Sequence, residues 1–435
     1  MDFGSWVRRK GFWIYDRLLM QGEHWKFYKE VRAAYMNGTD ERTVQCKIEE
    51  LLKHAADTTA FYTAYKGVLD LHKFPIVNKI AYQQRWNDFV SSEHAVDPKC
   101  HLECTSGSTG TPLEIMYDRR KSRRRNAASI FLNTLADYQI GDKQLFLRVW
   151  VNRVQKGLVE RTMMNLLPIN TANMDDEHLQ EICDLIARKR VKSIVGYASS
   201  LAMLSAFIKD KQIDCSKYKV KSITPISEAM APKVRKQLQE QFRCTVSSVY
   251  GAEEFGTIGV QSKDGDDYYM DTSGVYLEVL KLEEDIPAED GELGRLVITD
   301  LYNYAFPLIR YENGDIVVRK TIKKSGGRYK QYFTRIDGRR SDLLYATNGE
   351  PVSPFLLTNK MWGIKNISQW KFIQTGEKTY RFVINGEQAD EAYIRGLICE
   401  ELGADAEIYF EYVDEIPVLS SGKRKYIENQ YKKNK

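Results

Sequence analysis

The sequence from residue 191 to residue 251 constrains the fold most, because apolar segments of strand length alternate there with amphipathic segments of helix length. One helix pattern begins near Ser199, where serines are suited to cap it, and a second begins at Pro232, since proline is tolerated in the first turn of a helix. The predicted strands are 191–197, 220–226 and 245–250. Three strands joined by two helices predict a parallel sheet covered by helices.

The carboxyl ends of these strands mark the expected site, because open parallel sheets bind ligands outside those ends. In this chain they carry Gly196–Tyr197, Ser227–Glu228 and the segment Tyr250–Gly251–Ala252–Glu253–Glu254. We therefore expect a binding site along this edge of the sheet.

On either side of the parallel sheet the pattern changes. Helical periodicity dominates up to about residue 95, and from about 268 to 335 short alternating segments are broken by glycine. Such segments are typical of a twisted antiparallel sheet or barrel. We therefore predict a large α/β domain over residues 1–337, built from parallel βαβ units and a distorted antiparallel barrel.

A second, smaller domain is predicted after a polar turn at 337–342. It begins with a hairpin pattern, continues with a helix over about 390–402 that stops at Gly403, and ends with a strand over 407–412. We interpret residues 338–435 as a mobile α+β domain that is hinged on the large one.

Composition excludes several classes of protein. Hydrophobic residues make up 43% and charged residues 28% of the 435, which is typical of a globular protein. The net charge of +5 is too small for this length to indicate nucleic-acid binding. No apolar run approaches the ~18–20 residues of a membrane span, and the first residues lack a secretory signal, so we expect a cytoplasmic location.

The seven cysteines are scattered and include no CxxC pair, which argues against a disulfide framework. Cys100, His101 and Cys104 lie close together in the sequence. A zinc site normally needs a second ligand pair at matching spacing, so we interpret these three as ordinary residues.

Two segments with basic residues lie outside the motifs, and the tail around Lys423, Arg424 and Lys425 is also basic. The run from Arg119 to Arg125 contains six arginines and lysines, and we interpret it as a solvated helix face, with attraction of an anionic substrate as the alternative. Near the N-terminus, Trp6, Phe12 and Trp13 stand among arginines and lysines and predict an amphipathic helix. Packing onto the main body is the expected role, and peripheral contact with an anionic membrane is the alternative.

A loop rich in small residues lies between two short strand patterns. Its backbone N–H groups and hydroxyls can bind phosphate oxygens, since glycine lets the chain approach closely. The loop is Thr105–Ser106–Gly107–Ser108–Thr109–Gly110–Thr111–Pro112. It is not a Walker P-loop, because no Lys-Ser or Lys-Thr follows and the next element is a strand. A generic polar surface turn is the alternative.

Three further motifs add groups suited to a nucleotide. A tyrosine ring offers a flat apolar face, a carboxylate oxygen suits a hard cation, and an aspartate can accept from both hydroxyls of a vicinal diol. A lysine can stabilise charge that develops at phosphorus. Together with Tyr250–Glu254, the motifs are Arg310–Tyr311–Glu312–Asn313–Gly314–Asp315, Gly338–Arg339 with Asp342, and Ser421–Gly422–Lys423.

In this order the motifs resemble those of the adenylate-forming enzymes, especially the phenylacetate–CoA ligase branch and its CapK-like members of capsular polysaccharide biosynthesis. Leu113 and Glu114 stand where many other adenylate-forming enzymes have a lysine, and Gly196–Leu201 also resembles a segment of this branch. The chain departs from the pattern at Glu253, where relatives often have threonine, and at Ser341, where they often have aspartate or lysine.

The resemblance implies a role for each motif. The loop would hold the β- and γ-phosphates, Tyr250 would stack on adenine, and Asp315 would accept the ribose hydroxyls. Glu254 would hold Mg²⁺ and Lys423 would act on the reacting centre, so these two are the predicted catalytic residues. The predicted nucleotide-binding residues are Thr105, Ser106, Gly107, Ser108, Thr109, Gly110, Ser227, Glu228, Tyr250, Gly251, Ala252, Asp315 and Arg339.

The implied reaction converts a small-molecule carboxylic acid and ATP to acyl-AMP and pyrophosphate. The acyl group then passes to an acceptor, expected to be coenzyme A, after a large rotation of the C-terminal domain. The alternatives are an amide-forming ligase that acylates an amino sugar of a capsule or O-antigen precursor, and a non-catalytic nucleotide-binding scaffold in polysaccharide assembly. The identity of the acid and the existence of a homodimer stay open at this level.

Overall fold

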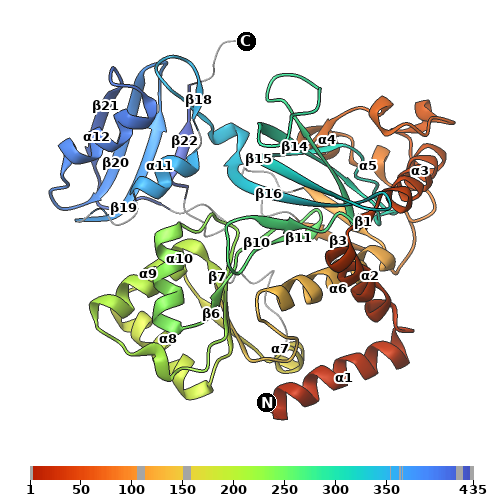
Figure 1. Ribbon diagram of the computed structural model, residues 1–435, viewed down its shortest axis with the longest axis horizontal. Coiled ribbons are helices and arrows are strands. Elements are labelled where there is room, and N and C mark those ends of the chain that lie inside the picture. The colour runs from red at the N-terminus through yellow and green to blue at the C-terminus, as the bar shows by residue number, and fades with distance from the viewer. Residues whose placement is uncertain are drawn as a thin grey trace.

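The computed structural model describes residues 3–104, 113–149, 158–352, 354–361, 364, 366–417 and 425–431. Within them the strands form three main sheets: five parallel strands, nine largely antiparallel strands and four strands near the C-terminus. In Figure 1 the parallel sheet lies at lower left, the nine-stranded sheet at right and the C-terminal sheet at upper left. The predicted α/β class, with parallel and antiparallel parts, is confirmed.

The predicted parallel sheet is present in the order β6-β5-β7-β8-β9, with every pair parallel. Its apolar interior is shared by the strands and three helices. The strands are β5 (Gln144–Arg148), β6 (Leu166–Asn170), β7 (Ser193–Tyr197), β8 (Ser222–Ile226) and β9 (Thr245–Val246). The helices are α8 (Asp176–Lys189), α9 (Ala198–Asp210) and α10 (Pro232–Phe242), and α7 (Leu158–Met164) precedes β6.

The third predicted strand, 245–250, is wrong as a single element. The chain leaves the parallel sheet at Val246 and enters the antiparallel sheet three residues later as β10 (Val249–Ala252), which pairs with β11 (Gly256–Gln261). A continuous strand pattern does not reveal which sheet each half joins, because both halves are partly buried. The molecule therefore changes sheets immediately before Tyr250.

The predicted serine cap of α9 is also not found. The capping position is Tyr197, which makes no side-chain capping bond, and the amide of Ser199 instead donates to the carboxylate of Glu228 at 2.8 Å. A carboxylate is favoured there because a helix N-terminus carries partial positive charge and unsatisfied N–H groups.

The antiparallel sheet predicted from residues 268–335 is present and extends further. Its strands run in the order β10-β11-β12-β16-β15-β14-β13, with β1 (Thr39–Asp40) paired to β16 and β2 (Val77–Asn78) to β15. The strands not yet bounded are β12 (Tyr268–Met270), β13 (Val275–Leu280), β14 (Leu293–Asp300), β15 (Tyr311–Lys324) and β16 (Arg328–Arg339). The hairpin of β3 (His101–Cys104) and β4 (Glu114–Tyr117) lies on either side of residues 105–112.

The first 95 residues are mainly helical, as predicted. α3 (Glu41–Thr58) packs its apolar face into the core beneath the antiparallel sheet. The other elements are α1 (Phe3–Leu19), α2 (Glu23–Asn37), α4 (Lys79–Gln84) and α5 (Trp86–Phe89), with short 3₁₀ turns at Thr63–Tyr65 and Leu71–Lys73 and a later one at Cys215–Lys217. No helix in the described ranges is both long enough and apolar enough to cross a bilayer.

Helix α1 packs onto the body by one edge only. Ser5 and Asp16 are buried, and Arg9 lies 3.9 Å from Asp142, whereas Phe3, Ile14 and Leu18 are exposed. The expected packing of the N-terminal helix therefore holds for its polar edge and for Phe12 and Trp13, whose rings contact α2, and not for the exposed apolar residues.

The basic run lies on α6 (Arg119–Leu135), and its interpretation as a solvated face is wrong for half of its members. Lys121, Arg123 and Arg124 are buried. Lys121 pairs with Asp300, Arg123 with Glu23, and Arg124 with Asp271 at 2.8 Å. The partners of Lys121 and Arg124 lie more than a hundred residues further along the chain, so the local charge pattern could not reveal them.

The C-terminal residues form a unit with its own sheet, in the order β21-β20-β19-β22, and its own apolar core. The predicted hairpin is β19 (Ile367–Gln374) with β20 (Thr379–Gly386), the predicted helix is α12 (Glu391–Leu402) with Gly403 at its end, and the predicted strand is β21 (Glu407–Tyr412). The remaining elements are η5 (Arg340–Asp342), β17 (Leu344–Tyr345), β18 (Pro351–Val352), α11 (Pro354–Met361) and β22 (Ile427–Asn429). The boundary between residues 337 and 338 remains a prediction.

Candidate active site

The candidate site lies where the chain passes from one sheet to the other. Ser227 and Glu228 follow β8 at its carboxyl end, and β10, which carries Tyr250, lies beside β8. Glu253 and Glu254 occupy the turn between β10 and β11. This arrangement brings together predicted residues from the two sheets.

Asp315 is the centre of a hydrogen-bonded cluster. The hydroxyl of Tyr250 donates to Asp315 Oδ2 at 2.6 Å, and the amide of Asn313 donates to the same oxygen at 2.7 Å. Arg339 Nε lies 3.2 Å from Asp315 Oδ1, because the two residues are cross-strand partners in β15 and β16. The cluster thus contains three predicted residues and one, Asn313, that sequence reasoning had not assigned a role.

Asn313 also fixes the geometry of the cluster. Its side-chain Nδ2 donates to the Tyr250 hydroxyl at 3.0 Å, and its side-chain Oδ1 accepts from the backbone N–H of Asp315 at 3.0 Å. Burial, reinforced by the charge of Asp315, raises the pKa of Tyr250, so the phenol remains protonated and acts as the donor. A signal for Asn313 existed, since it lies two residues before Asp315 in the same sequence motif.

The number of hydrogen bonds that Asp315 already accepts determines how many it can accept from a ligand. A carboxylate accepts about four hydrogen bonds. Tyr250 and Asn313 already donate two hydrogen bonds, both to Oδ2, and Arg339 forms an ion pair with Oδ1. About two hydrogen bonds can therefore still be accepted, which is the number that the two hydroxyls of a ribose would donate.

Glu254 is buried and is oriented by Tyr311, whose hydroxyl donates to Oε1 at 3.0 Å. Burial first, and then the charge of Glu254, raise the pKa of Tyr311, so this phenol also stays protonated. A single oriented carboxylate fits a Mg²⁺ ion, which commonly takes one or two carboxylates together with phosphate oxygens.

Two cations lie in the electric field of Glu254. Burial would lower the pKa of Arg339, but Asp315 and Glu254 raise it above its usual value. Lys79, at the start of α4, has a pKa lowered by burial and by Arg339, with Glu254 acting in the opposite direction. Arg339 therefore pairs with Asp315 and is also stabilised by the charge of Glu254, and Lys79 is a nearby cation for which the sequence carried no signal.

Glu253, the main departure from the family pattern, has a cationic partner. Arg125 Nη2 lies 3.0 Å from Glu253 Oε2, and Arg125 Nη1 lies 2.9 Å from Glu103 Oε1. The Tyr117 hydroxyl lies within hydrogen-bonding distance of the carbonyl oxygens of Glu253 and Glu254, at 2.7 and 2.8 Å. The turn that carries Glu254 is thus held by the β3–β4 hairpin and by α6.

Close packing explains both glycines of this turn. A Cβ on Gly251 would lie 2.3 Å from the carbonyl oxygen of Gly256, and Gly256 itself has φ of +79° against the Arg125 side chain. The glycine of the predicted nucleotide motif therefore has a steric role in the protein, whatever it contributes to a ligand.

The remaining predicted residues divide into three groups. Glu228 is engaged as the cap of α9, and Ser227 beside it is exposed with φ of +67°. Arg310 is buried and bonds both oxygens of Glu278, so it supports the fold. Lys423 and the whole loop from Thr105 to Gly110 lie outside the described residues. Close to Lys423 in sequence, Lys425 pairs with Asp342, which belongs to the motif that begins at Gly338, at 3.0 Å.

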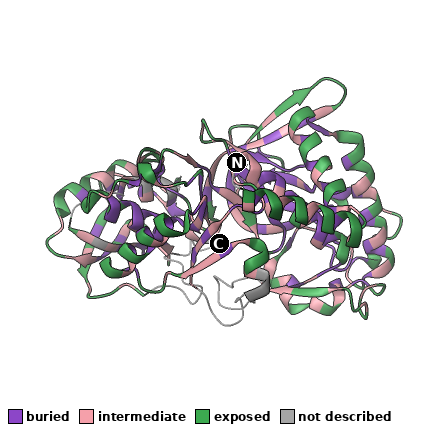
Figure 2. Ribbon diagram, turned by 90° about the horizontal axis from the view of Figure 1, so that it is seen from below, coloured by how far each residue is buried: buried purple, intermediate pink, exposed green. Residues whose placement is uncertain are grey.

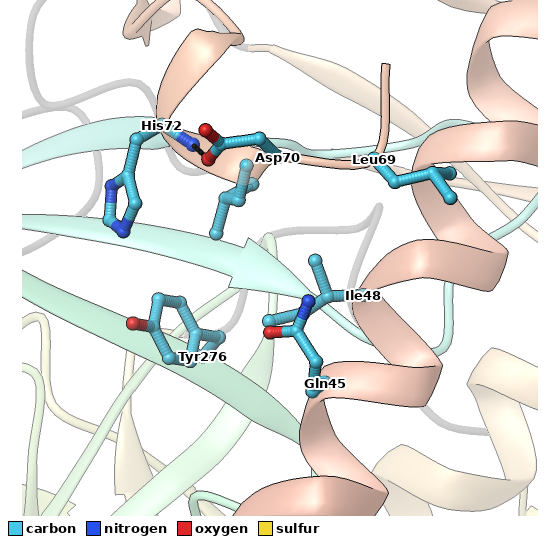
Figure 3. Close-up of a pocket in the computed structure, with 7 residues that line it drawn as sticks. Gln45, Ile48, Leu69, Asp70, His72 and Tyr276 are labelled. Atoms are coloured by element: carbon cyan, nitrogen blue, oxygen red, sulfur yellow. Dashed lines mark hydrogen bonds between the residues drawn. The ribbon is translucent and has the colours of Figure 1, made fainter. Parts of the chain in front are cut away.

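A separate hollow of about 330 Å³ lies between α3, the turn at residues 69–72 and β13 (Figure 3). Gln45, Asp70, His72 and Tyr276 are among its lining residues, and none of the predicted site residues is. Asp70 is already engaged, since it accepts from the His72 amide at 3.0 Å. The nucleotide site predicted from the motifs therefore does not lie in this hollow.

Comparison with known proteins agrees with the motifs. Residues 344–430 match the family described as the CapK C-terminal domain. The chain is 23% identical to Protein CapK of Staphylococcus aureus over 276 residues, which cover 62% of this chain and 60% of that protein. It is also 23% identical to phenylacetate-coenzyme A ligase of Pseudomonas putida over 338 residues, covering 73% and 74%.

Solved structures share the fold. A 2-hydroxyisobutyryl-CoA ligase in complex with 2-HIB-AMP matches with a TM-score of 0.69 and 15% identity, over 90% of this chain and 89% of that one. ATP-bound MatB from Rhodopseudomonas palustris matches with a TM-score of 0.54 and 16% identity, over 74% and 65%. The fold is that of the adenylate-forming ligases, and the resemblance to their phenylacetate–CoA ligase and CapK branch, predicted from the motifs, is confirmed.

Proposed function

We propose that this chain activates a carboxylic acid with ATP to form an acyl adenylate. A carboxylate oxygen attacks the α-phosphorus, the bond from that phosphorus to the bridging oxygen breaks, and pyrophosphate leaves. The observation that carries the proposal is the cluster of Tyr250, Asn313, Asp315 and Arg339 beside the oriented carboxylate of Glu254. No protein nucleophile is required, because such a transfer depends mainly on positioning and electrostatic stabilisation.

Each residue has a task in this reaction. Asp315 accepts a ribose hydroxyl, and Tyr250 presents its ring to adenine while its hydroxyl keeps Asp315 in place. Glu254 is the predicted ligand of Mg²⁺, which when bound neutralises charge on the phosphates. The predicted tasks of Lys423 at the reacting centre and of Thr105–Gly110 at the phosphates complete the site.

The acceptor of the acyl group is proposed to be coenzyme A. An amine acceptor is the second candidate, because the fold is also that of the amide bond synthetase McbA, at a TM-score of 0.50 and 15% identity over 72% of this chain and 65% of that one. The similarity to CapK makes an amino sugar the amine to examine first. A scaffold without catalysis is the outcome that would contradict both.

The first experiment is carboxylate-dependent exchange of pyrophosphate into ATP, with aryl, fatty, amino and sugar acids. We expect exchange with one class of acid, and a loss of more than about 100-fold in Lys423→Ala with ATP binding retained. Asp315→Asn is expected to weaken ATP binding about 10-fold or more, because its charge-assisted bonds are lost. Asp267→Asn, at a half-buried carboxylate that pairs with Lys320 outside the site, serves as the control. Measurable ATP binding without exchange for any acid would contradict the proposed activity.

The acceptor is assigned separately by supplying the adenylating enzyme with coenzyme A or with amino sugars. Formation of a thioester identifies the acid–thiol ligase, whereas formation of an amide identifies the alternative. Acyl-AMP that accumulates with both would place the acceptor in another chemical class.

A further inference from the structure

Two histidines and a glutamate converge outside the candidate active site, where α3 ends beside the turn after α5. One ligand atom from each of His54, Glu93 and His94 lies within 4.8 Å of the others. The two histidines are half-buried and Glu93 is exposed. The three residues come from two segments about forty positions apart, so local sequence does not account for their proximity.

The hydrogen bonds of His54 determine which ring nitrogen carries its proton. Nε2 lies 2.9 Å from the carbonyl oxygen of Tyr304 and 3.2 Å from Thr58 Oγ1, whose own hydrogen is donated to the carbonyl oxygen of His54. Nε2 therefore faces two acceptors and must be the protonated nitrogen. In the neutral ring, the lone pair of Nδ1 then lies 3.7 Å from Glu93 Oε2, so two acceptors face each other without a hydrogen between them.

The outer partners of these residues are those typical of metal sites. A ligating histidine usually donates its other N–H to a backbone carbonyl or another acceptor, which fixes the ring. His94 Nδ1 lies 3.2 Å from Ser91 Oγ. The turn is anchored by the Ser91 amide on Ala305 at 3.0 Å and by the Ser92 amide on Thr58 at 2.8 Å.

We propose that His54, Glu93 and His94 bind a divalent transition-metal ion with the preferences of Zn²⁺, which accepts two imidazoles and a carboxylate and fills its shell with water. The ion would join the end of α3 to the turn at residues 91–94. It is separate from the Mg²⁺ expected at Glu254 and does not depend on the proposed function.

The test is titration of the full-length, chelator-treated protein with ZnCl₂ against a chromophoric zinc indicator, without nucleotide. The wild type is expected to bind one equivalent that His54→Ala and His94→Ala lose or bind at least about 10-fold more weakly. Glu93→Gln, at an exposed position, tests the same site if a histidine variant fails to fold. His178→Ala, at a half-buried histidine 3.4 Å from Glu181, is the matched control. Wild-type protein without tight zinc, or equal loss in the control, would show that His54 and Glu93 form only an ion pair.

An independent observation concerns the outer surface of α1 and α2. Phe3, Val7, Ile14 and Leu18 are 77%, 45%, 57% and 72% exposed, and their spacing places them on one side of α1. In Figure 2, α1 begins near the mark N and is exposed over most of its length. Trp25 of α2, 46% exposed, has its ring centre 4.9 Å from that of Trp13. We call this surface the α1–α2 face.

The charges of the α1–α2 face have one sign. Among the described residues of the two helices, the exposed charged side chains are Arg8, Lys10, Arg17, Lys26, Lys29 and Arg32. The acidic side chains of the two helices are either buried or paired with a cation. Asp16 is buried, Glu23 pairs with Arg123, and Glu30 pairs with Lys47. An apolar stripe among cations, with tryptophan at its border, is the pattern of a helix that lies in the plane of an anionic membrane.

We infer that the α1–α2 face binds an anionic lipid surface, in contact with its headgroups and without crossing it. Association with a second copy through the same face would bring six cations against six, because a twofold interface pairs each patch with itself. Charge complementarity therefore favours lipid.

The test is sedimentation of the full chain with vesicles of phosphatidylcholine alone or with phosphatidylglycerol. We expect binding to the anionic vesicles only, weakened by high salt, and at least 10-fold weaker for the triple variant Phe3→Ser, Ile14→Ser and Leu18→Ser. The matched control changes Val96, Ile286 and Ile322, which are exposed elsewhere, to serine. Equal binding by the triple variant and wild type, or a dimer that the triple variant dissociates without any vesicle binding, would overturn the inference.

Discussion

Helices α1 and α6 are similar in sequence character and opposite in environment. Each combines several arginines and lysines with apolar residues over 17 positions. On α6 the basic residues Lys121, Arg123 and Arg124 are buried against carboxylates, whereas on α1 Arg8, Lys10 and Arg17 are exposed. The apolar residues differ in the same way, since Phe131 and Leu132 of α6 are buried and Ile14 and Leu18 of α1 are exposed.

The difference shows that a basic run is interpretable only together with its distant acidic partners. Asp271 and Asp300 are buried near the antiparallel sheet and require cations, because an unpaired buried carboxylate is strongly unfavourable. Helix α6 supplies those cations and is drawn into the interior. Helix α1 meets one such acid at its edge, Asp142, and the rest of its basic residues remain in solvent.

The largest expected effect is on α6. Arg124→Ala leaves Asp271 buried without its cation, since Arg124 donates to Asp271 at 2.8 Å and to Ser273 at 2.9 Å. We expect a loss of about 3–5 kcal/mol in the free energy of unfolding, measured by urea denaturation. Arg17→Ala on α1 should change it by less than about 0.5 kcal/mol. Equal effects for the two variants would remove the distinction between the helices.

Truncation of an apolar side chain should give the next largest difference in stability between the two helices. Leu132→Ala opens a cavity in a packed core and is expected to lower the free energy of unfolding by about 2–5 kcal/mol. Ile14→Ala removes an exposed side chain and should stay within about 0.5 kcal/mol. A large loss for Ile14→Ala in dilute protein would mean that this side chain is covered in solution, for example by a second copy.

Arg125 should affect activity more than stability. Arg125→Ala frees Glu253 and loosens the turn that carries Glu254, and we expect adenylation to fall about 10- to 100-fold, since small displacements of catalytic groups have effects of this size. Arg125→Lys keeps the positive charge but cannot contact Glu103 and Glu253 through two separate nitrogens, so it should recover only part of the rate. Arg119→Ala, at an exposed position of the same helix, is the control in the exchange assay.

The smallest effect concerns a fully exposed ion pair. Hydrogen bonds from Lys378 and Thr347, together with the charge of Lys378, lower the pKa of Asp405 to about 2. Because the folded-state pKa lies below the usual 3.8, the pair stabilises the fold above about pH 4 and loses this contribution as the pH falls through about 2. The Tm difference between wild type and Asp405→Asn should be constant from pH 7 to 5 and shrink below pH 4. A difference as large at pH 2 as at pH 7 would contradict this assignment.

The sequence predicted elements well where a periodic pattern continues within one sheet. Strands β7 and β8, helices α9 and α10, and the C-terminal helix α12 lie within a few residues of their predicted bounds. The prediction failed between Val246 and Val249, because strand periodicity does not encode which neighbour a strand pairs with.

The residues of the candidate site also divide into those that the sequence predicted and those that it did not. Tyr250, Asp315 and Arg339 were predicted from their motifs and meet in the structure. Tyr311, Arg125 and Tyr117 were not, because each acts on a residue 57 to 137 positions away. Such contacts depend on the tertiary fold, which local residue spacing does not contain.

Arg339 lies at the junction between the antiparallel sheet and the C-terminal unit. It is the last residue of β16, opposite Asp315, and it is followed directly by η5, which leads to the unit at residues 344–430. A rotation of that unit would therefore act on the sheet first at the cross-strand pair of Asp315 and Arg339. If Asp315 accepts a ribose hydroxyl as proposed, a nucleotide that strengthens this pairing would, by reciprocity, also bias the orientation of the C-terminal unit.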